Sequence, residues 1–474
     1  MKLYKSTIVK VLLPLLGTVL LAGCSKTILV SYPSQLAPAR KDLSDGKYAA
    51  AEKQITEESN SQDAVLYNAE LARVQQIAGQ YKASLATYQK AIQEVEKQNL
   101  AAKVQGSRVL ATAASMFTND NAIPYLMPGF AQVFLYQYQA LNYYSLDDAV
   151  NALVSIRKAD NQQRFVKQQH YQEIVAAQKM AKKKKYDYNP KTFAKYFAQT
   201  QGAAGKIKSS FENAFTYYLS SVAFEANHDY NNAWVSIQNA LGVQPNNDTI
   251  RRQLLEVLSQ RGASTEQMLR YKLKFGYLTI PKIPKNQGKL VVVYEQGLVP
   301  PRQSLTIPIP IIFGDLNQVQ KVAIPIYRKD KRPIPNLAVD LQKLKMGTTS
   351  VVVNTEEMAA KALLEEYPLI ITRTVLRLIA KTAATHEANK KDELAGLIIQ
   401  ILSNITTQAD LRSWLTLPRT IQIWQGYLPA GKNNLSLSTG GLKRPVTASI
   451  SAGQTTVLWV IQIGHMWRVN VMQL

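Results

Sequence analysis

Apolar residues recur at helical spacing through the first part of the chain, from about residue 40 to residue 270. Two consecutive segments show the pattern most fully: Tyr67, Leu71, Val74 and Ala78, then Leu85, Tyr88, Ile92 and Val95. Residues three or four positions apart share one face of a helix. The pattern therefore predicts an antiparallel pair of amphipathic helices here.

Short segments of this helical region repeat. Gly46-Lys47-Tyr48 with Ala51 returns 33 residues later as Gly79-Gln80-Tyr81 with Ser84, Tyr88 and Ala91. A third unit carries the positions Tyr217, Phe224, Tyr230, Ala233, Ile237, Ala240 and Pro245, whereas Leu146, Ala149, Leu153 and Ile156 give only half a unit. These units resemble tetratricopeptide repeats, which stack into a curved layer whose concave face often binds peptides. The same positions suit any helical core, so they identify no binding residue.

Prolines, glycines and polar residues mark the breaks in the helical pattern. We expect a spacer over 24–40, a loop from Pro124 to Gly129, and a polar connection over 186–210. The densest charge run, Lys182 to Lys185, is typical of a solvated loop between helices. Pro281, Pro284 and Gly288 predict a linker that ends the helical region.

Alternating and β-branched residues follow this linker and predict strands. The expected strands are Leu290–Tyr294, Leu305–Ile312, Val322–Tyr327, Leu337–Leu341, Ser350–Val353, Thr420–Tyr427, Asn434–Leu437, Thr447–Ile450, Thr455–Ile463 and Trp467–Met472. Pro308, Pro310 and Pro325 cannot donate to a ladder, so we expect them at sheet edges or bulges. Residues 355–404 return to a helical pattern. The C-terminal part is therefore predicted to be an α+β domain with a mainly antiparallel sheet and an inserted helical hairpin.

The chain begins with a segment built like an export signal. Lys2, Lys5 and Lys10 precede the apolar run Val11–Ala22. This run is shorter than the about 20 residues that span a bilayer, so we expect a cleaved signal over residues 1–23 and no anchor helix there.

Cys24 is the only cysteine, and it closes the segment Leu21-Ala22-Gly23-Cys24. This segment resembles the lipobox of bacterial lipoproteins. The resemblance implies cleavage before Cys24, a diacylglycerol on its thiol and an acyl chain, such as palmitate, on the new amino end. Lipoproteins of this kind that stay in the inner membrane usually carry Asp after the cysteine, whereas this chain has Ser25. The resemblance therefore also implies a location at the periplasmic leaflet of the outer membrane. A soluble secreted protein with an incidental cysteine is the alternative.

Composition narrows the classes of partner. The formal net charge is +23, and 46% of the residues are hydrophobic, as in a globular protein. A net positive charge of this size favours encounter with anionic surfaces or with an acidic partner. No nucleic-acid module is recognisable, so we expect no nucleic-acid partner.

The polar residues form no recognisable catalytic or metal-binding motif. The four histidines are far apart, and none has the spacing of a metal site, so no metal, cofactor or catalytic set is predicted. The segment from Ser438 to Lys443 is typical of a hairpin turn. An enzyme would have to use a carboxylate such as Glu295 or Asp410 without a supporting motif.

Two features of the C-terminal part are candidates for binding and for structure. Arg373, Arg377 and Lys381 fall at i, i+4 and i+8 and predict a basic stripe on one helix, which could clamp an acidic partner or an anionic polymer. A solvated face, or pairing with acids of the same domain, is the preferred explanation of this spacing. In Ala409–Pro418, we expect Trp414 to fill the core while Asp410 and Arg412 fix the turn.

These segments together resemble one uncharacterised family of proteobacterial outer-membrane lipoproteins. The resemblance covers Tyr143–Gln163, Lys289–Pro301, the Arg373–Lys381 helix, Ala409–Pro418 and Leu428–Gly431. It implies an envelope factor whose genes often lie near lipoproteins that regulate peptidoglycan synthases. No activity is attached to it.

The sequence thus predicts a signal over 1–23, an acylated spacer over 24–40, a helical-repeat domain over 41–275 and an α+β domain over 288–474. The expected function is that of a lipid-anchored periplasmic scaffold or adaptor, without enzymatic activity. It would bind an envelope protein through its helical repeats, within peptidoglycan synthesis or an envelope assembly. The alternative is direct binding of an anionic glycan or lipid by the basic surface.

Overall fold

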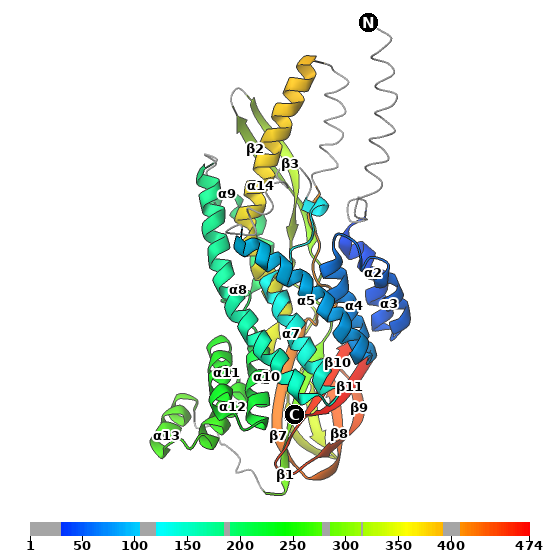
Figure 1. The fold of residues 1–474 in the computed structure, drawn as a ribbon, viewed down its shortest axis with the longest axis vertical. Helices are drawn as coiled ribbons and strands as arrows, with labels where there is room; N and C mark the ends of the chain where they lie inside the picture. Colours follow the sequence, from blue (N-terminus) through cyan, green and yellow to red (C-terminus); the bar gives the residue numbers. More distant parts are fainter. Residues whose placement is uncertain (1–29, 105–119, 184–189, 277–284, 314–315, 392–407) are drawn as a thin grey trace.

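The computed structural model describes residues 30–104, 120–183, 190–276, 285–313, 316–391 and 408–474 (Figure 1). Within these ranges, helices occupy the chain up to residue 276. Strands begin at residue 287 and continue to the end, with one long helix among them. The predicted fold class is confirmed at this level, as a helical N-terminal part followed by a C-terminal part built on β-sheet.

The helical part consists of neighbouring helices joined by short connections. They are α2 (Tyr32–Ser44), α3 (Tyr48–Thr56), α4 (Ala64–Ala78), α5 (Tyr81–Val104), the 3-10 turn η3 (Asp120–Ala122), α7 (Gly129–Tyr144), α8 (Ala149–Lys183), α9 (Pro190–Ala204), α10 (Ala214–Ala226), α11 (Tyr230–Val243), α12 (Asp248–Gln260) and α13 (Thr265–Lys274). Helices α4 and α5 pack together as the predicted pair, and so do α10 and α11 of the third unit. Gly79 ends α4 with a φ of +82°, a left-handed conformation that glycine adopts without strain.

Two predicted connections in this part are wrong. The spacer expected to reach residue 40 is shorter, because α2 begins at Tyr32 with Pro33 in its first turn, where a missing N–H costs no intrahelical bond. The polar connection expected over 186–210 contains α9. Its many polar residues surround a buried stripe of Phe193 and Phe197, and the Phe197 ring stacks on Tyr367 at 4.0 Å. The loop before α7 is confirmed.

The strands of the C-terminal part follow the predicted segments closely. They are β1 (Gln287–Gln296), β2 (Gln303–Phe313), β3 (Leu316–Ile326), β4 (Ala338–Leu341), β5 (Leu344–Thr348), β6 (Ser350–Asn354), β7 (Thr420–Pro429), β8 (Gly431–Thr439), β9 (Leu442–Ile450), β10 (Thr455–Ile463) and β11 (Met466–Gln473). Strand β5 was not predicted, and Gly288 belongs to β1 rather than to a linker. Helix α14 (Thr355–Lys391) is the first arm of the expected helical insertion, whose remainder lies outside the described residues.

The strands form three sheets. One has five strands in the order β11-β10-β1-β7-β6, one has four in the order β5-β4-β8-β9, and β2 with β3 forms a two-stranded ribbon. Pairing is antiparallel throughout except between β1 and β10, so the prediction of a mainly antiparallel sheet is confirmed. Pro308, Pro310 and Pro325 lie in the ribbon, where each strand has a free edge, as predicted.

Alternating side chains of β1 divide the interior into two cores. Leu290, Val292 and Tyr294 join the core between the five-stranded and four-stranded sheets. Val291 and Val293 point the other way and join the larger core shared with the helices. Successive side chains of a strand face opposite sides, so one strand serves both layers. The five-stranded sheet is therefore the middle of three layers.

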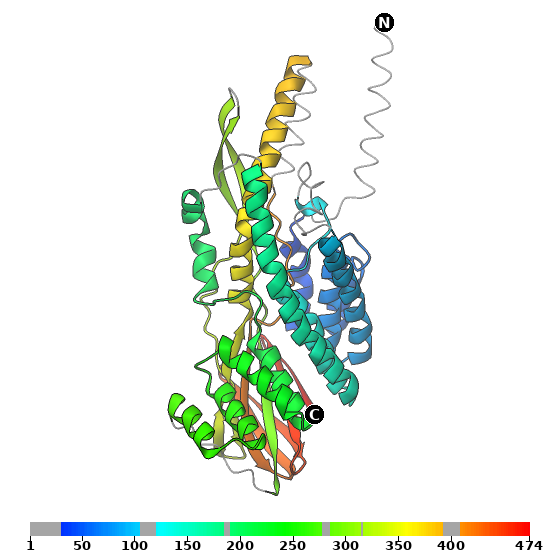
Figure 2. The same cartoon turned by 60° about the vertical axis from the view of Figure 1, so that its left-hand side comes forward.

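The larger core also unites the two predicted domains. It runs from Tyr32 in α2 to Met472 in β11 without a break at the expected boundary near residue 280. The two parts of the chain are thus packed as one body. The β2–β3 ribbon and the far half of α14 project from one end of that body (Figures 1 and 2). Within the described ranges, no helix has the length and apolar character needed to cross a membrane.

Candidate functional site

The predicted basic stripe lies on α14, and the structure places its members in different environments. Arg377 is buried, and its Nη2 donates to Asp120 Oδ1 of η3 at 2.8 Å. Arg373 is partly buried, and the side chain of Lys381 is outside the described part. Arg377 therefore pairs with an acid of the same chain, across the predicted domain boundary. The spacing could mean a binding surface or pairing with acids of the chain itself, and the Arg377 side chain is used for pairing.

The inner helices of the helical layer are buried on all sides. Every residue of α4 from Val65 to Ile77 is buried, and so is every residue of α10 from Ala214 to Glu225. Helix α7 is buried from Phe130 to Asn142. A repeat layer that bound a peptide on this face would leave it open. Here the face is filled by the chain's own C-terminal part.

The segment Ala409–Pro418 lies against these inner helices. Trp414 is 2% exposed and packs against both Tyr88 of α5 and Tyr138 of α7. The centroid of its ring lies 6.2 Å from that of each tyrosine, and the two tyrosine rings stack on each other at 6.1 Å. The backbone amides of Leu415 and Thr416 donate to the two carboxylate oxygens of Glu70, at 2.5 and 2.9 Å. The segment is thus held as a bound peptide would be, by an aromatic anchor and by main-chain hydrogen bonds. The prediction that Trp414 fills the core is confirmed.

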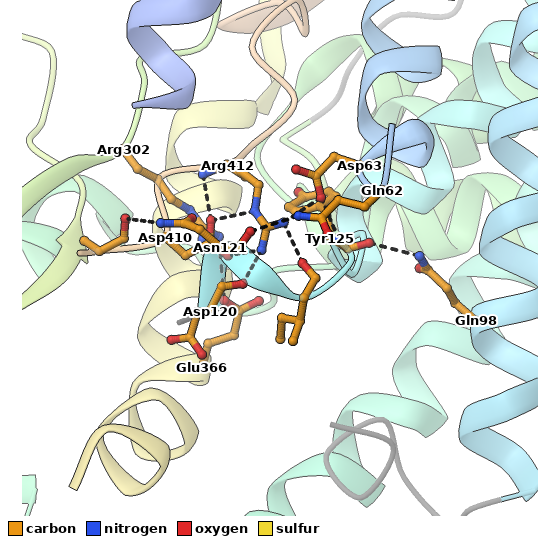
Figure 3. Close-up of polar contacts among 12 residues, drawn as sticks. Gln62, Asp63, Gln98, Asp120, Asn121, Tyr125, Arg302, Glu366, Asp410 and Arg412 are labelled. Carbon is orange, nitrogen blue, oxygen red and sulfur yellow. Dashed lines mark hydrogen bonds and ion pairs between the residues drawn. The ribbon is translucent and has the colours of Figure 1, made fainter. Parts of the chain in front are cut away.

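Arg412 is the centre of a buried polar cluster in the same segment (Figure 3). Its Nε and Nη2 donate to Asp410 at 2.9 and 2.7 Å, and its Nη1 donates to Asp63 Oδ1 at 2.6 Å. The remaining two N–H groups reach the carbonyl oxygens of Asp120 and Ile123, at 2.7 and 2.8 Å. All five guanidinium donors therefore have acceptors, which is what a buried arginine requires.

The contacts within the cluster change the pKa values of Asp410, Asp63 and Arg412. Burial alone would raise the pKa of Asp410, but Arg412 and Arg302 outweigh it and hold that pKa below its ordinary value. Burial raises the pKa of Asp63 despite the nearby Arg412 guanidinium. Asp410 and Asp63 in turn raise the pKa of Arg412 against the effect of its burial, so the guanidinium stays charged. The expected role of Asp410 and Arg412 in fixing the turn is confirmed, and it extends to η3 and α4.

A second buried ion pair joins α4 to the sheet. Arg73 and Glu295 pair at 1% and 0% side-chain exposure. The Arg73 guanidinium lies over the Tyr138 ring, 4.3 Å from its centroid, and Trp459 Nε1 donates to Glu295 Oε1 at 3.2 Å. Glu295, considered above as a carboxylate for an enzyme, is therefore bound to an arginine and an indole.

A third buried cluster surrounds Lys289 of β1. Its Nζ lies 2.7 Å from Glu225 of α10 and 2.8 Å from Glu256 of α12. Burial opposes the charge of Lys289, but the two carboxylates hold its pKa well above the ordinary value. These clusters each tie one or two helices to a strand or loop of the C-terminal part.

The sequence singled out Arg412, Asp410 and Glu295. It did not single out Asp63 and Arg73, which pair with Arg412 and Glu295, or Glu70, which accepts from the amides of Leu415 and Thr416. A signal for two of these residues was present, because Glu70 and Arg73 interrupt the apolar helix Ala64–Ala78. Charged residues at such positions are rarely buried unless paired. Their partners lie more than 200 residues away, so no local pattern could identify them.

The structure locates some of the other segments that were considered above for a site. Ser438 to Lys443 forms the expected turn between β8 and β9. Within the described ranges, no group of three histidine, cysteine or acidic residues could hold a metal ion. Cys24, the predicted lipidation site, lies outside the described residues.

Comparison with protein-family models, with curated proteins and with solved structures finds no match to the chain.

Proposed function

We propose that the chain is a lipid-anchored periplasmic adaptor of the outer membrane that binds a protein partner through an outward-facing helix, α13, rather than through the inner face of its helical layer. The observation that carries the proposal is a pair of exposed leucines on that helix. Leu269 and Leu273 are 49% and 53% exposed. They lie four residues apart, so they share one face of the helix.

Helix α13 is attached to the body by its other face. Tyr271 packs edge-on against Trp234 of α11, with ring centroids 5.7 Å apart, and Phe275 follows in contact with Tyr271. No residue of α13 itself is buried. Figure 2 shows this helix at an outer corner of the molecule, away from the sheet. A partner could reach the leucines without displacing any part of the core.

Charge on α13 favours an acidic partner. Arg270 and Lys272 flank the leucine face, and Lys274 lies further round the helix. The acid Glu266 lies on the leucine face and pairs with Arg270 at 3.5 Å, so the three cations leave the helix with a net positive charge. A protein segment with apolar anchors at helical spacing and acidic flanks would complement this surface. The resemblance to envelope lipoproteins makes the regulation of peptidoglycan synthesis, or an envelope-spanning assembly, the setting in which to seek that partner.

The proposed anchor limits where this partner can be. Cys24 and Val30, the first described residue, are six positions apart. Six residues span at most about 20 Å, whatever their conformation. An acylated Cys24 would therefore keep the body close to the membrane surface. This supports a partner that works at the outer membrane rather than one that diffuses in the periplasm.

The structural roles of the buried carboxylates support a non-enzymatic function. Glu295 and Asp410 each neutralise a buried arginine. The pairing of Arg377 with Asp120 also removes one cation from the stripe considered for glycan or lipid binding. We therefore place the adaptor function first.

Chemical crosslinking in intact cells tests the proposal. We expect the tagged protein to form a discrete adduct with another protein, and Leu269→Asp with Leu273→Asp to abolish it. Leu100→Asp is the matched control, because Leu100 is 64% exposed on α5 and lies outside the proposed surface. Equal adducts in both variants, or no adduct in the parent protein, would refute a binding surface on α13.

A further inference from the structure

A cavity of about 510 Å³ lies where the α11–α12 connection and the start of α12 meet strands β5, β6 and the middle of β7. Its polar wall, supplied by the helical part, includes Asn246, Asp248 and Arg252, and the strands supply Met346, Val351 and Trp424. The volume is within the range of small-molecule sites, about 300 to 1,000 Å³. The cavity is separate from α13 and from the Arg412 cluster.

The polar wall is held in place by neighbouring side chains. Arg251 donates to Pro245 O at 2.8 Å, to Asn246 Oδ1 at 2.9 Å and to Asp248 Oδ1 at 3.2 Å. Asn247 caps α12 and donates to Ser350 Oγ of β6 at 2.8 Å. This arrangement leaves the amide nitrogen of Asn246 and the second carboxylate oxygen of Asp248 without a partner among the described residues. Preorganised donors and acceptors of this kind lower the entropic cost of binding a ligand.

Trp424 lines the cavity with a donor that is not used. The residue is 9% exposed, and its indole Nε1 has no hydrogen-bond acceptor within the described part of the chain and is not among the fully buried atoms that lack a partner. Two glycines make room for this ring, since a Cβ at Gly347 would collide with Nε1 and a Cβ at Gly426 would collide with the six-membered ring. The donor is thus available to a ligand in the cavity.

The chemistry of the lining selects a class of ligand. Donors come from Trp424, Asn246 and Arg252, an acceptor comes from Asp248, and Met346 with Val351 supplies apolar surface. A purely apolar ligand would leave the polar wall unpaired. A small inorganic anion would meet the Asp248 carboxylate. A sugar ring matches the whole set, because it carries hydroxyl groups around its edge and C–H groups on its faces.

We propose that this cavity binds one sugar unit of an oligosaccharide, with the Trp424 N–H, Asn246 and Arg252 donating to its oxygens and Asp248 accepting from a hydroxyl. The site is independent of the protein partner proposed for α13. An envelope protein with both sites would hold a glycan strand and a protein on two different surfaces.

The test is saturation-transfer difference NMR on the full-length protein in detergent micelles. The probes are the tetramer of N-acetylglucosamine, cellotetraose and a hyaluronan tetrasaccharide. An alanine tetrapeptide tests whether the cavity binds a peptide instead. We expect at least one tetrasaccharide to bind, and Asn246→Ala and Arg252→Ala each to weaken that binding about tenfold, since each removes a hydrogen-bond donor. Both positions are exposed, so these variants should keep the parent melting temperature.

Arg444→Ala is the matched control, because Arg444 is an exposed arginine of β9 outside the cavity. It should bind the sugar as the parent does. Trp424→Phe, which removes the donor and keeps an aromatic ring, should also weaken binding. The proposal is overturned if no tetrasaccharide binds, if only the peptide binds, or if Asn246→Ala and Arg252→Ala bind like Arg444→Ala. Loss of the protein adduct of α13 would leave these results unchanged, so the two proposals can fail separately.

Discussion

Arg412 and Asp63 are 349 residues apart in the chain, yet Arg412 Nη1 donates to Asp63 Oδ1 at 2.6 Å in the buried interior. This contact joins the most recognisable segment of the sequence, Ala409–Pro418, to the start of α4. It shows why that segment has the residues it has. They hold the helical part and the sheet together.

Replacing Arg412 should destabilise the whole protein. Arg412→Met leaves Asp63 without its cation in the interior and removes from Asp410 the arginine that it binds directly, so we expect a loss of about 3 to 5 kcal/mol in the free energy of unfolding. Arg332→Met is the control, because Arg332 pairs with Asp330 at 78% side-chain exposure and should cost less than about 1 kcal/mol. Urea unfolding measures both. Equal effects of the two variants would show that the cluster contributes no more than a surface pair.

Trp414 should couple the two parts of the chain during unfolding. Trp414→Ala removes the ring that packs against Tyr88 and Tyr138, with an expected loss of about 3 to 5 kcal/mol in the free energy of unfolding. Because the larger core spans both parts, calorimetry should show one transition that moves to lower temperature. Two separate transitions in the parent protein, with only one shifted by the variant, would mean that the helical part and the sheet fold independently.

Stability should fall as the pH rises toward neutrality. Burial raises the pKa of Glu70 to about 7, against the amides of Leu415 and Thr416, and burial raises the pKa of Asp160 to about 7. Unfolded carboxyls titrate near pH 4, so between about pH 4 and 7 the folded state binds more protons than the unfolded state. The free energy of unfolding therefore decreases through this window, by up to about 3 kcal/mol for Glu70.

Urea unfolding at pH 5, 6, 7 and 8 checks this dependence. Glu70→Gln removes one titrating group and should flatten the curve between pH 5 and 7. The lowered pKa of Asp410 acts in the opposite sense, but only below about pH 4, outside this range. A parent protein that gains stability from pH 5 to 7, with the same slope in Glu70→Gln, would contradict the assignment.

Arg377 should matter for stability. Arg377→Gln leaves Asp120 without its partner, and Asp120→Asn should have a similar effect, since each variant breaks the same pair. We expect a loss of about 1 to 3 kcal/mol from each, and less than the sum of the two losses in the double variant. The double-mutant cycle measures this coupling directly. Additive losses would indicate that the two side chains act separately.

Local pattern was enough to predict most elements of the fold. Helical spacing identified α4, α5, α10 and α11, and alternation identified every strand except β5. That strand, Leu344–Thr348, has exposed and partly exposed positions only, so no buried alternation marks it. Helix α9 was missed for a related reason, because its two large buried residues, Phe193 and Phe197, stand among many polar residues.

Contacts between segments far apart in the chain could not be predicted from the sequence. The change from helical spacing to alternating residues near residue 280 correctly separates helices from strands. It does not reveal that the helical part and the C-terminal part share one core. The repeat pattern likewise predicts helix pairs without showing what covers their inner face. The basic spacing of Arg373, Arg377 and Lys381 could not distinguish a free surface from the pairing of Arg377 with Asp120.

The most direct test of the adaptor function is site-specific photo-crosslinking in intact cells. A photoreactive residue at Leu273 should yield one discrete protein adduct in the membrane fraction, whereas the same residue at Leu100 should yield none. An adduct from Leu100 alone, or no adduct from Leu273, would contradict binding of a protein partner by the outer face of α13.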